Sequence, residues 1–117
     1  MGARLIVYIT LLFSLAAFTL LRNQTWYQER WLWGDAVAKS GKARAHANYG
    51  ASLQNEDGSF EALERAKYHY VLATQKDPYM ALPYLNLGEL LVRGGDHEVG
   101  RRLLRFYACA MEYEQCE

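Results

Sequence analysis

The chain of 117 residues has no excess of charge of either sign and very little proline. Lysine plus arginine number 13, as do aspartate plus glutamate, so no basic field is available to attract nucleic acid. Pro78 and Pro83 are the only prolines, and no low-complexity linker divides the sequence. The composition therefore predicts no nucleic-acid partner and agrees with a continuous helical domain.

Motifs that carry chemistry are also absent. The sequence has no glycine-rich phosphate loop, no Gly-x-Ser-x-Gly and no Cys-x-x-Cys-His for haem. His46, His69 and His97 lie far apart, and none has a second histidine or a cysteine at the spacing of metal ligands. We therefore predict a protein that is not an enzyme, with no catalytic residues, no metal site and no cofactor.

Charge is missing altogether from the 17 residues between Leu5 and Leu21, which Arg4 and Arg22 bound. As a helix this run is about 26 Å long, slightly short of a hydrocarbon core of roughly 30 Å, and both arginines can snorkel. A cleaved signal peptide is the alternative, but no Ala-x-Ala site follows and the run exceeds the usual apolar region of about 7–15 residues. We predict that residues 1–22 form a retained single-span anchor, which contacts membrane lipid through residues 4–22.

Aromatic residues crowd the stretch that follows this run, at Trp26, Tyr27, Trp31 and Trp33. Such residues are typical of the interface between a membrane and water. They could equally pack the first helix of the domain that follows. The sequence leaves both roles open.

Residues 43–78 and 81–117 share one pattern, in which a short helix, a glycine-containing turn and a longer helix follow one another. The short helices carry matching motifs, Asn48-Tyr49-Gly50 and Asn86-Leu87-Gly88. Because one helical hairpin cannot bury its own apolar face, such repeats stack into a solenoid. Solenoids usually bind other molecules, so the repeat predicts an interaction protein.

In these stretches the sequence resembles the tetratricopeptide repeat family. Gly50 and Gly88 match the positions where two helices cross closely, and Asp77-Pro78 matches the stop before the next repeat. The first repeat is about one turn longer than the family's roughly 34 residues, and the second lacks a closing proline. Further matches are Ala66, Tyr70 and Ala73, and a preceding half-repeat contains Trp33, Ala36 and Ser40-Gly41.

The resemblance implies an all-α protein, in which an N-terminal transmembrane helix precedes a short α-solenoid of about two and a half helical hairpins. Its parts are the anchor (1–22), a half-repeat helix with its connection (23–42) and two hairpins (43–117). Thr25, Ser59 and Asp96 are the expected N-caps, and Asp57-Gly58 and Gly94-Gly95 form the expected turns. The helices are expected at residues 4–21, 25–39, 43–55, 59–76, 81–93 and 96–115, and continuation of the first helix without a break is the alternative.

By the same resemblance, the first helix of each hairpin lines an inner, partner-binding surface. Asn48 and Asn86 match asparagines that can hydrogen-bond an extended peptide, and bonding between helices is the alternative. His46 takes a place where the family usually packs an aromatic ring, which implies a structural role. The residues expected to face a partner are Arg44, Asn48, Ala51, Leu82, Leu85, Asn86, Glu89 and Arg93.

The last predicted helix carries an apolar stripe that is wider than one neighbouring helix would cover. The surplus predicts a contact with another molecule, and ordinary packing against the preceding helices is the alternative. The stripe consists of Val99, Leu103, Phe106, Tyr107, Ala110 and Tyr113, and Leu104, Ala108 and Met111 widen it.

The two cysteines, Cys109 and Cys116, are seven residues apart on this helix. Seven helical residues rise about 10.5 Å, whereas a disulfide needs Cα atoms within roughly 4.4–6.8 Å. A disulfide between them therefore requires the helix to end near Tyr113 and the tail to fold back. That disulfide and a pair of free thiols both stay open.

Two signals for orientation disagree. Basic residues follow the anchor at Arg22, Arg30, Lys39, Lys42 and Arg44, which favours a cytoplasmic domain. The junction through residues 23–43, however, resembles that of membrane glycosyltransferases that end in an exoplasmic tetratricopeptide domain. The chain lacks their other spans and catalytic loops, so only the topology carries over. We expect an inner (plasma) membrane protein with a periplasmic or otherwise exoplasmic C-terminal domain.

A domain of about 95 residues buries only a modest core and has little stability to spare. We therefore expect it to function in a complex, as a membrane-anchored scaffold or accessory subunit that binds protein partners in a larger membrane or envelope assembly. The alternative is a structural protein that binds copies of itself, forming an oligomer or filament through end-to-end stacking of its repeats.

Overall fold

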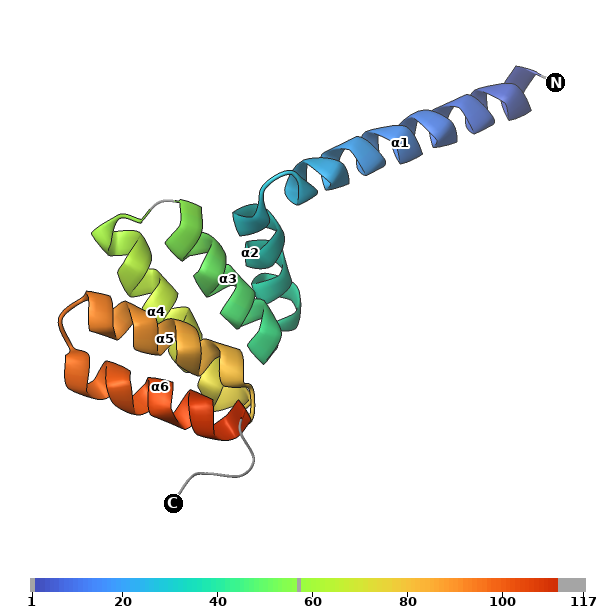
Figure 1. Cartoon of the computed structure of the whole chain (residues 1–117). Coiled ribbons are helices and arrows are strands. Elements are labelled where there is room, and N and C mark those ends of the chain that lie inside the picture. Colours follow the sequence, from blue (N-terminus) through green and yellow to red (C-terminus); the bar gives the residue numbers. More distant parts are fainter. Residues whose placement is uncertain (1, 57, 112–117) are drawn as a thin grey trace.

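The computed structural model describes residues 2–56 and 58–111. Within these residues every regular element is a helix, short turns join the helices, and there is no strand, as expected for the all-α class (Figure 1). The helices are α1 (Gly2–Trp26), α2 (Glu29–Ser40), α3 (Ala43–Glu56), α4 (Phe60–Lys76), α5 (Ala81–Arg93) and α6 (His97–Met111).

The first helix, α1, projects away from the other helices, which pack together in chain order (Figure 1). Helix α2 packs on α3, and α4 packs on α5, so that the hairpins α3/α4 and α5/α6 lie next to each other. With α1 included, the molecule measures 77 × 33 × 18 Å. The apolar core therefore lies in α3–α6, while α1 keeps its described side chains exposed.

The core sits where α3, α4 and α5 meet. Its buried members are Leu53, Ala66, Tyr70, Leu87 and Leu90, and Tyr49, Leu63, Leu91 and Leu103 pack against them. Small residues permit the close contacts, since Ala66 and Ala73 on α4 are fully buried. Three of the positions matched to the repeat family, Ala66, Tyr70 and Ala73, are thus core residues.

Glycines allow the two helices of each hairpin to approach closely. A Cβ on Gly50 would lie 2.8 Å from Cε1 of Tyr70, and a Cβ on Gly88 would lie 2.9 Å from Cγ of Leu104. Gly100 faces Gly88 from α6, and a Cβ there would lie 2.8 Å from the Gly88 carbonyl oxygen. These distances are too short for any side chain, so glycine is required where the helices cross.

At three turns, the residues predicted to start or end helices do so in the structure. Ser59 caps α4, because its hydroxyl accepts a hydrogen bond from the Ala62 amide at 3.2 Å. Gly41, Gly58 and Gly95 adopt positive φ angles after α2, before α4 and before α6. That backbone conformation favours glycine, so these residues end or separate the helices as the sequence predicted.

The prediction of Thr25 as an N-cap is wrong. Helix α1 continues to Trp26, and α2 begins at Glu29 after Gln28, which is extended at φ −125° and makes no side-chain cap bond. Residues 22–26 contain neither glycine nor proline, so nothing in them stops the apolar helix from continuing. As a result α1 is longer than the expected 4–21 at both ends.

The apolar stripe predicted for the last helix is only partly buried. Gly100 and Leu104 face α5, and Leu103 packs against the core, whereas Val99 and Phe106 are exposed. The Phe106 ring still contacts Tyr84, with centroids 4.8 Å apart. The close crossing at Gly88 and Gly100 turns this part of α6 toward α5 and leaves the edge of the stripe uncovered. Residues 112–115 of the expected helix lie outside the described residues.

Candidate functional site

The residues predicted to face a partner lie on two neighbouring helices, α3 and α5, which are in direct contact. Arg44 is exposed in the first turn of α3, and Asn48 and Ala51 are half-buried further along it. On α5, Leu82 and Arg93 are exposed at the two ends, and Leu85, Asn86 and Glu89 are half-buried between them. Their binding role stays a prediction, and Arg44, Leu82 and Arg93 are the exposed members.

Asn86 takes part in a polar network below this surface. The Tyr70 hydroxyl on α4 donates a hydrogen bond to Oε1 of Gln54 on α3 at 2.9 Å. Burial raises the pKa of Tyr70 to about 12, opposed by a side-chain hydrogen bond from Asn86 and assisted by the charge of Glu89. Asn86 thus approaches Tyr70 of α4 from α5, and its role in binding a peptide stays a prediction.

Tyr49 makes a second polar link between helices. Its hydroxyl accepts a hydrogen bond from the Arg65 guanidinium of α4 at 3.2 Å. Its ring lies beside Gly34 of α2, where a Cβ would be 3.4 Å from Cε2. The aromatic residue of the Asn-x-Gly motif therefore connects α2, α3 and α4.

His46 and His69, which are 23 residues apart, meet between α3 and α4. Their Nδ1 atoms lie 3.0 Å apart and their rings are stacked, with centroids at 5.2 Å. One Nδ1 must donate and the other must accept, so the hydrogen bond requires at least one neutral ring. Tyr49 and Tyr68 contact the His69 ring edge-on.

Burial keeps this pair neutral. It is the main cause that lowers the pKa of His69 to about 4, with smaller contributions from His46 and the charge of Arg65. Burial also lowers the pKa of His46, helped by the charge of Lys76. Two nearby cations disfavour a metal ion here, and no group of three or more potential metal ligands occurs in the described part of the chain.

The histidine pair was missed by the search for metal-ligand spacing, which covers only short separations. The signal that could have found it is the antiparallel register of the hairpin. Gly50 on α3 lies against Ala66 and Tyr70 on α4. His46 is one turn before Gly50, so its antiparallel partner must lie toward the Tyr70 end of this contact, and His69 is the residue next to Tyr70.

At the opposite end of the chain, α1 is long and apolar enough to cross a membrane, judged by its length and composition. Its 25 residues correspond to about 37 Å, which exceeds a hydrocarbon core of roughly 30 Å. None of its candidate span is buried by the rest of the protein. The apolar surface of α1 is therefore free to contact lipid.

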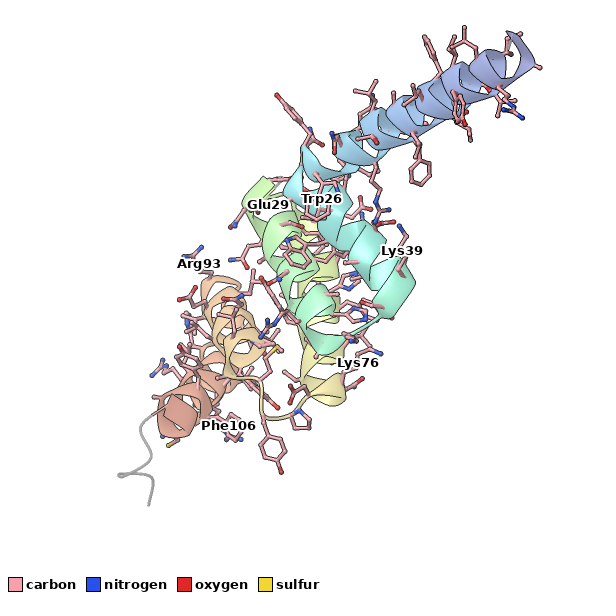
Figure 2. The ribbon with its side chains drawn as sticks, turned by 90° about the vertical axis from the view of Figure 1, so that its right-hand side faces the viewer. Trp26, Glu29, Lys39, Lys76, Arg93 and Phe106 are labelled. Carbon is pink, nitrogen blue, oxygen red and sulfur yellow. The ribbon has the colours of Figure 1, made fainter. Side chains whose placement is uncertain are left out.

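The structure separates the aromatic residues near the end of α1 into two groups. Trp26, Tyr27 and Trp31 are 61%, 89% and 60% exposed, whereas Trp33 is half-buried. Figure 2 shows Trp26 and Glu29 at the bend between α1 and α2. Trp33 therefore has the packing role that the sequence left open, and the other three are accessible.

A shallow hollow of about 470 Å³ lies at the start of α3. It is lined by residues 41–44, Lys76, Asp77 and Met80. The Asp77 side chain is engaged locally, where it accepts a hydrogen bond from the Tyr79 amide at 3.1 Å. Of the residues predicted to face a partner, Arg44 lines this hollow. Lys42 and Lys76 add two further positive charges to the lining.

The sequence leaves open a disulfide between Cys109 and Cys116, and of these two residues the structure describes Cys109. Cys109 is disulfide-bonded, and no described cysteine is free. Cys116 lies outside the described residues, as does the expected helix end near Tyr113.

The chain matches no protein-family model, no curated protein and no solved structure. The resemblance to tetratricopeptide repeats therefore rests on the residues of this chain alone.

Proposed function

We propose that this protein is a membrane-anchored scaffold, not an enzyme, whose short tetratricopeptide-like solenoid binds a protein partner within a larger membrane or envelope complex. The observation that carries the proposal is the contrast between α1 and the rest. The candidate span of α1 is apolar and is not buried by the rest of the protein, while α3–α6 form a small core among themselves and α2 packs on α3. An anchor joined to a packed helical domain is a design for holding a binding surface at a membrane.

The solenoid interpretation is supported by the packing of the two hairpins. Each hairpin crosses at a glycine of an Asn-x-Gly motif, Gly50 in the first and Gly88 in the second. The hairpins pack in chain order through α4 and α5, so a third could add on at α6 in the same way. The exposed Val99 and Phe106 on α6 favour some contact at that end.

The proposed partner surface lies on α3 and α5, with Arg44 and Arg93 as its accessible charged residues. Neither makes an ion pair with another described residue. We place this surface on the periplasmic or otherwise exoplasmic side of an inner (plasma) membrane, following the resemblance of the junction after the anchor. Modification of a cysteine introduced at exposed Gln75, in intact cells, tests the orientation with an impermeant reagent.

Photo-crosslinking from single positions tests the binding surface. A benzophenone amino acid replaces Arg44 or Arg93, and Gln75, exposed on α4, is the matched control. We expect adducts with a different protein from Arg44 and Arg93 and none from Gln75. Equal adducts from all three positions, or none from any, would overturn the proposed surface.

Self-assembly is the second candidate, and the exposed apolar residues of α6 favour it. Val99 and Phe106 lie at an end of the packed helices that no further helix covers among the described residues. If chains stack there, the detergent-solubilised protein has a mass of at least two chains, and Phe106→Ser lowers it. A monomer with unchanged mass in both forms excludes this candidate.

A further inference from the structure

Helix α2 is held close to the end of α1 by charged side chains. Arg22 on α1 lies 3.5 Å from Oδ2 of Asp35 on α2, and Lys39 donates to the same oxygen at 2.7 Å. The two helices also contact each other directly. At the start of α2, the Arg30 amide donates a hydrogen bond to Oε1 of Glu56 on α3 at 3.3 Å, which connects α2 to the packed helices. The position of α2 therefore follows that of α1.

If α1 crosses a membrane, its geometry gives the depth of this region. Phe13 is the middle residue of the uncharged run, and Trp26 lies 13 residues further along the same helix. At 1.5 Å per residue that is about 20 Å from the bilayer centre, beyond the roughly 15 Å of one hydrocarbon leaflet. The headgroup layer extends to about 20–22 Å, so Trp26 and Tyr27 fall within it.

The side chains present there have the chemistry of that layer. Trp26, Tyr27 and Trp31 combine large apolar rings with a polar N–H or O–H, and all three are mostly exposed. The Arg30 guanidinium carbon lies 6.0 Å from the centroid of the Trp31 ring, which places a cation beside the aromatic surface. In a bilayer, lipid phosphate groups would attract the Arg30 guanidinium, and the aromatic rings would lie at the boundary between the headgroups and the acyl chains.

We propose that α2 lies in the headgroup layer of the same bilayer that α1 crosses, with Trp26, Tyr27 and Trp31 inserted among the lipids. This inference rests on the proposed membrane anchor and adds a second contact, which holds the solenoid at a defined angle to the membrane. The occupant of the aromatic surface is lipid and not protein, because Trp26 lies on the anchor helix α1 itself, five residues beyond its uncharged run.

Depth-dependent quenching of tryptophan fluorescence tests the proposal. Three variants each keep one tryptophan, Trp26, Trp31 or Trp33, and replace the other two by phenylalanine. A fourth replaces all three and carries Phe13→Trp as a reporter of the anchor. Each is reconstituted as the full chain in vesicles of phosphatidylcholine and phosphatidylglycerol, which carry bromine either near the headgroup or deep in the acyl chains.

We expect bromine near the headgroup to quench Trp26 and Trp31 more strongly than deep bromine. Half-buried Trp33 is the matched control on the same helix, and its quenched fraction should be lower by roughly twofold or more. The Phe13→Trp reporter should respond most to deep bromine. Equal far-ultraviolet circular dichroism of all variants shows that they are folded. In an otherwise unchanged chain, Trp31→Phe should remove part of the lipid quenching, and Trp33→Phe should not.

The outcomes separate the two proposals. A quenched Phe13→Trp reporter with Trp31 no more quenched than Trp33 overturns the contact of α2 with lipid and leaves the anchor intact. An unquenched reporter overturns the anchor itself, and the contact with it. Stronger quenching of Trp31 by deep bromine also contradicts the proposed depth.

Discussion

The Tyr70 ring lies directly against the backbone of Gly50, so that a Cβ on Gly50 would be 2.8 Å from Cε1 of the ring. The Ala66 carbonyl oxygen lies 3.2 Å from the same point. This contact sets how closely α3 and α4 approach, and the contact of Gly88 with Leu104 does the same for α5 and α6. At both crossings the helices can approach this closely because glycine has no Cβ atom.

Gly50→Ala should therefore destabilise the domain. The added methyl forces the fully buried Tyr70 ring or the backbone of α4 to move, and overpacking of this kind costs about 1–3 kcal/mol. We expect a lower midpoint in thermal unfolding of the solubilised protein, followed by circular dichroism. Gly34→Ala in α2 is the control, since its methyl meets only the Tyr49 ring at 3.4 Å and helix propensity favours it. An unchanged midpoint for Gly50→Ala would contradict the close crossing.

Tyr70→Phe removes the hydroxyl from the network that joins α3, α4 and α5. Gln54 then loses the hydrogen bond at 2.9 Å, and Asn86 loses its buried acceptor. Both side chains are only half-buried, so we expect the cost of a typical lost hydrogen bond, about 0.5–1.5 kcal/mol. Tyr79→Phe removes a hydroxyl from a fully exposed ring and should leave the unfolding midpoint within experimental error. If both variants behave alike, the network contributes nothing to stability.

The histidine pair predicts a loss of stability in acid. Because the pKa of His69 falls from 6.5 to about 4 on folding, the unfolded chain binds more protons between these values. The free energy of unfolding should be at its highest above pH 6.5, decline as pH falls toward 4, and lose nothing further from this group below that. His46, with its pKa also lowered, acts in the same direction.

Unfolding midpoints of His69→Gln across this pH range measure the effect. The variant should show a shallower dependence on pH than the unmodified protein, because carboxylate titration is common to both. His97→Gln, at an exposed position on α6, should keep the original slope. Parallel curves for His69→Gln and the unmodified chain would show that folding does not lower the pKa of His69, which contradicts the buried pair.

Ser59→Ala should weaken the start of α4 by about 1 kcal/mol, since the Ala62 amide loses its side-chain acceptor. Ser40→Ala is the matched control, because that hydroxyl bonds only to the Ala36 carbonyl at the end of α2. Hydrogen exchange of the first-turn amides of α4 measures the local change. Exchange that is equally fast in both variants would contradict a capping role for Ser59.

Much of the fold could be predicted because its signals are local. Gly41, Gly58 and Gly95 take positive φ, Ser59 caps α4, and Pro78 follows the end of α4, each within a few residues of the boundary it marks. The prediction of Thr25 as an N-cap failed for a different reason. A capping residue starts a helix only where the preceding helix has ended, and nothing in residues 22–26 ends α1.

By itself, the sequence determined the helices and the apolar run of α1, since dihedral preferences, capping and hydrophobicity are properties of neighbouring residues. The tertiary structure alone decided which side chains meet. It brought His46 to His69 across 23 residues, joined Asn86 to Tyr70, and buried part of Trp33 while exposing Trp31 two positions away. Each of these outcomes depends on how closely and in what register the helices pack, and that is set by contacts between residues far apart in the chain.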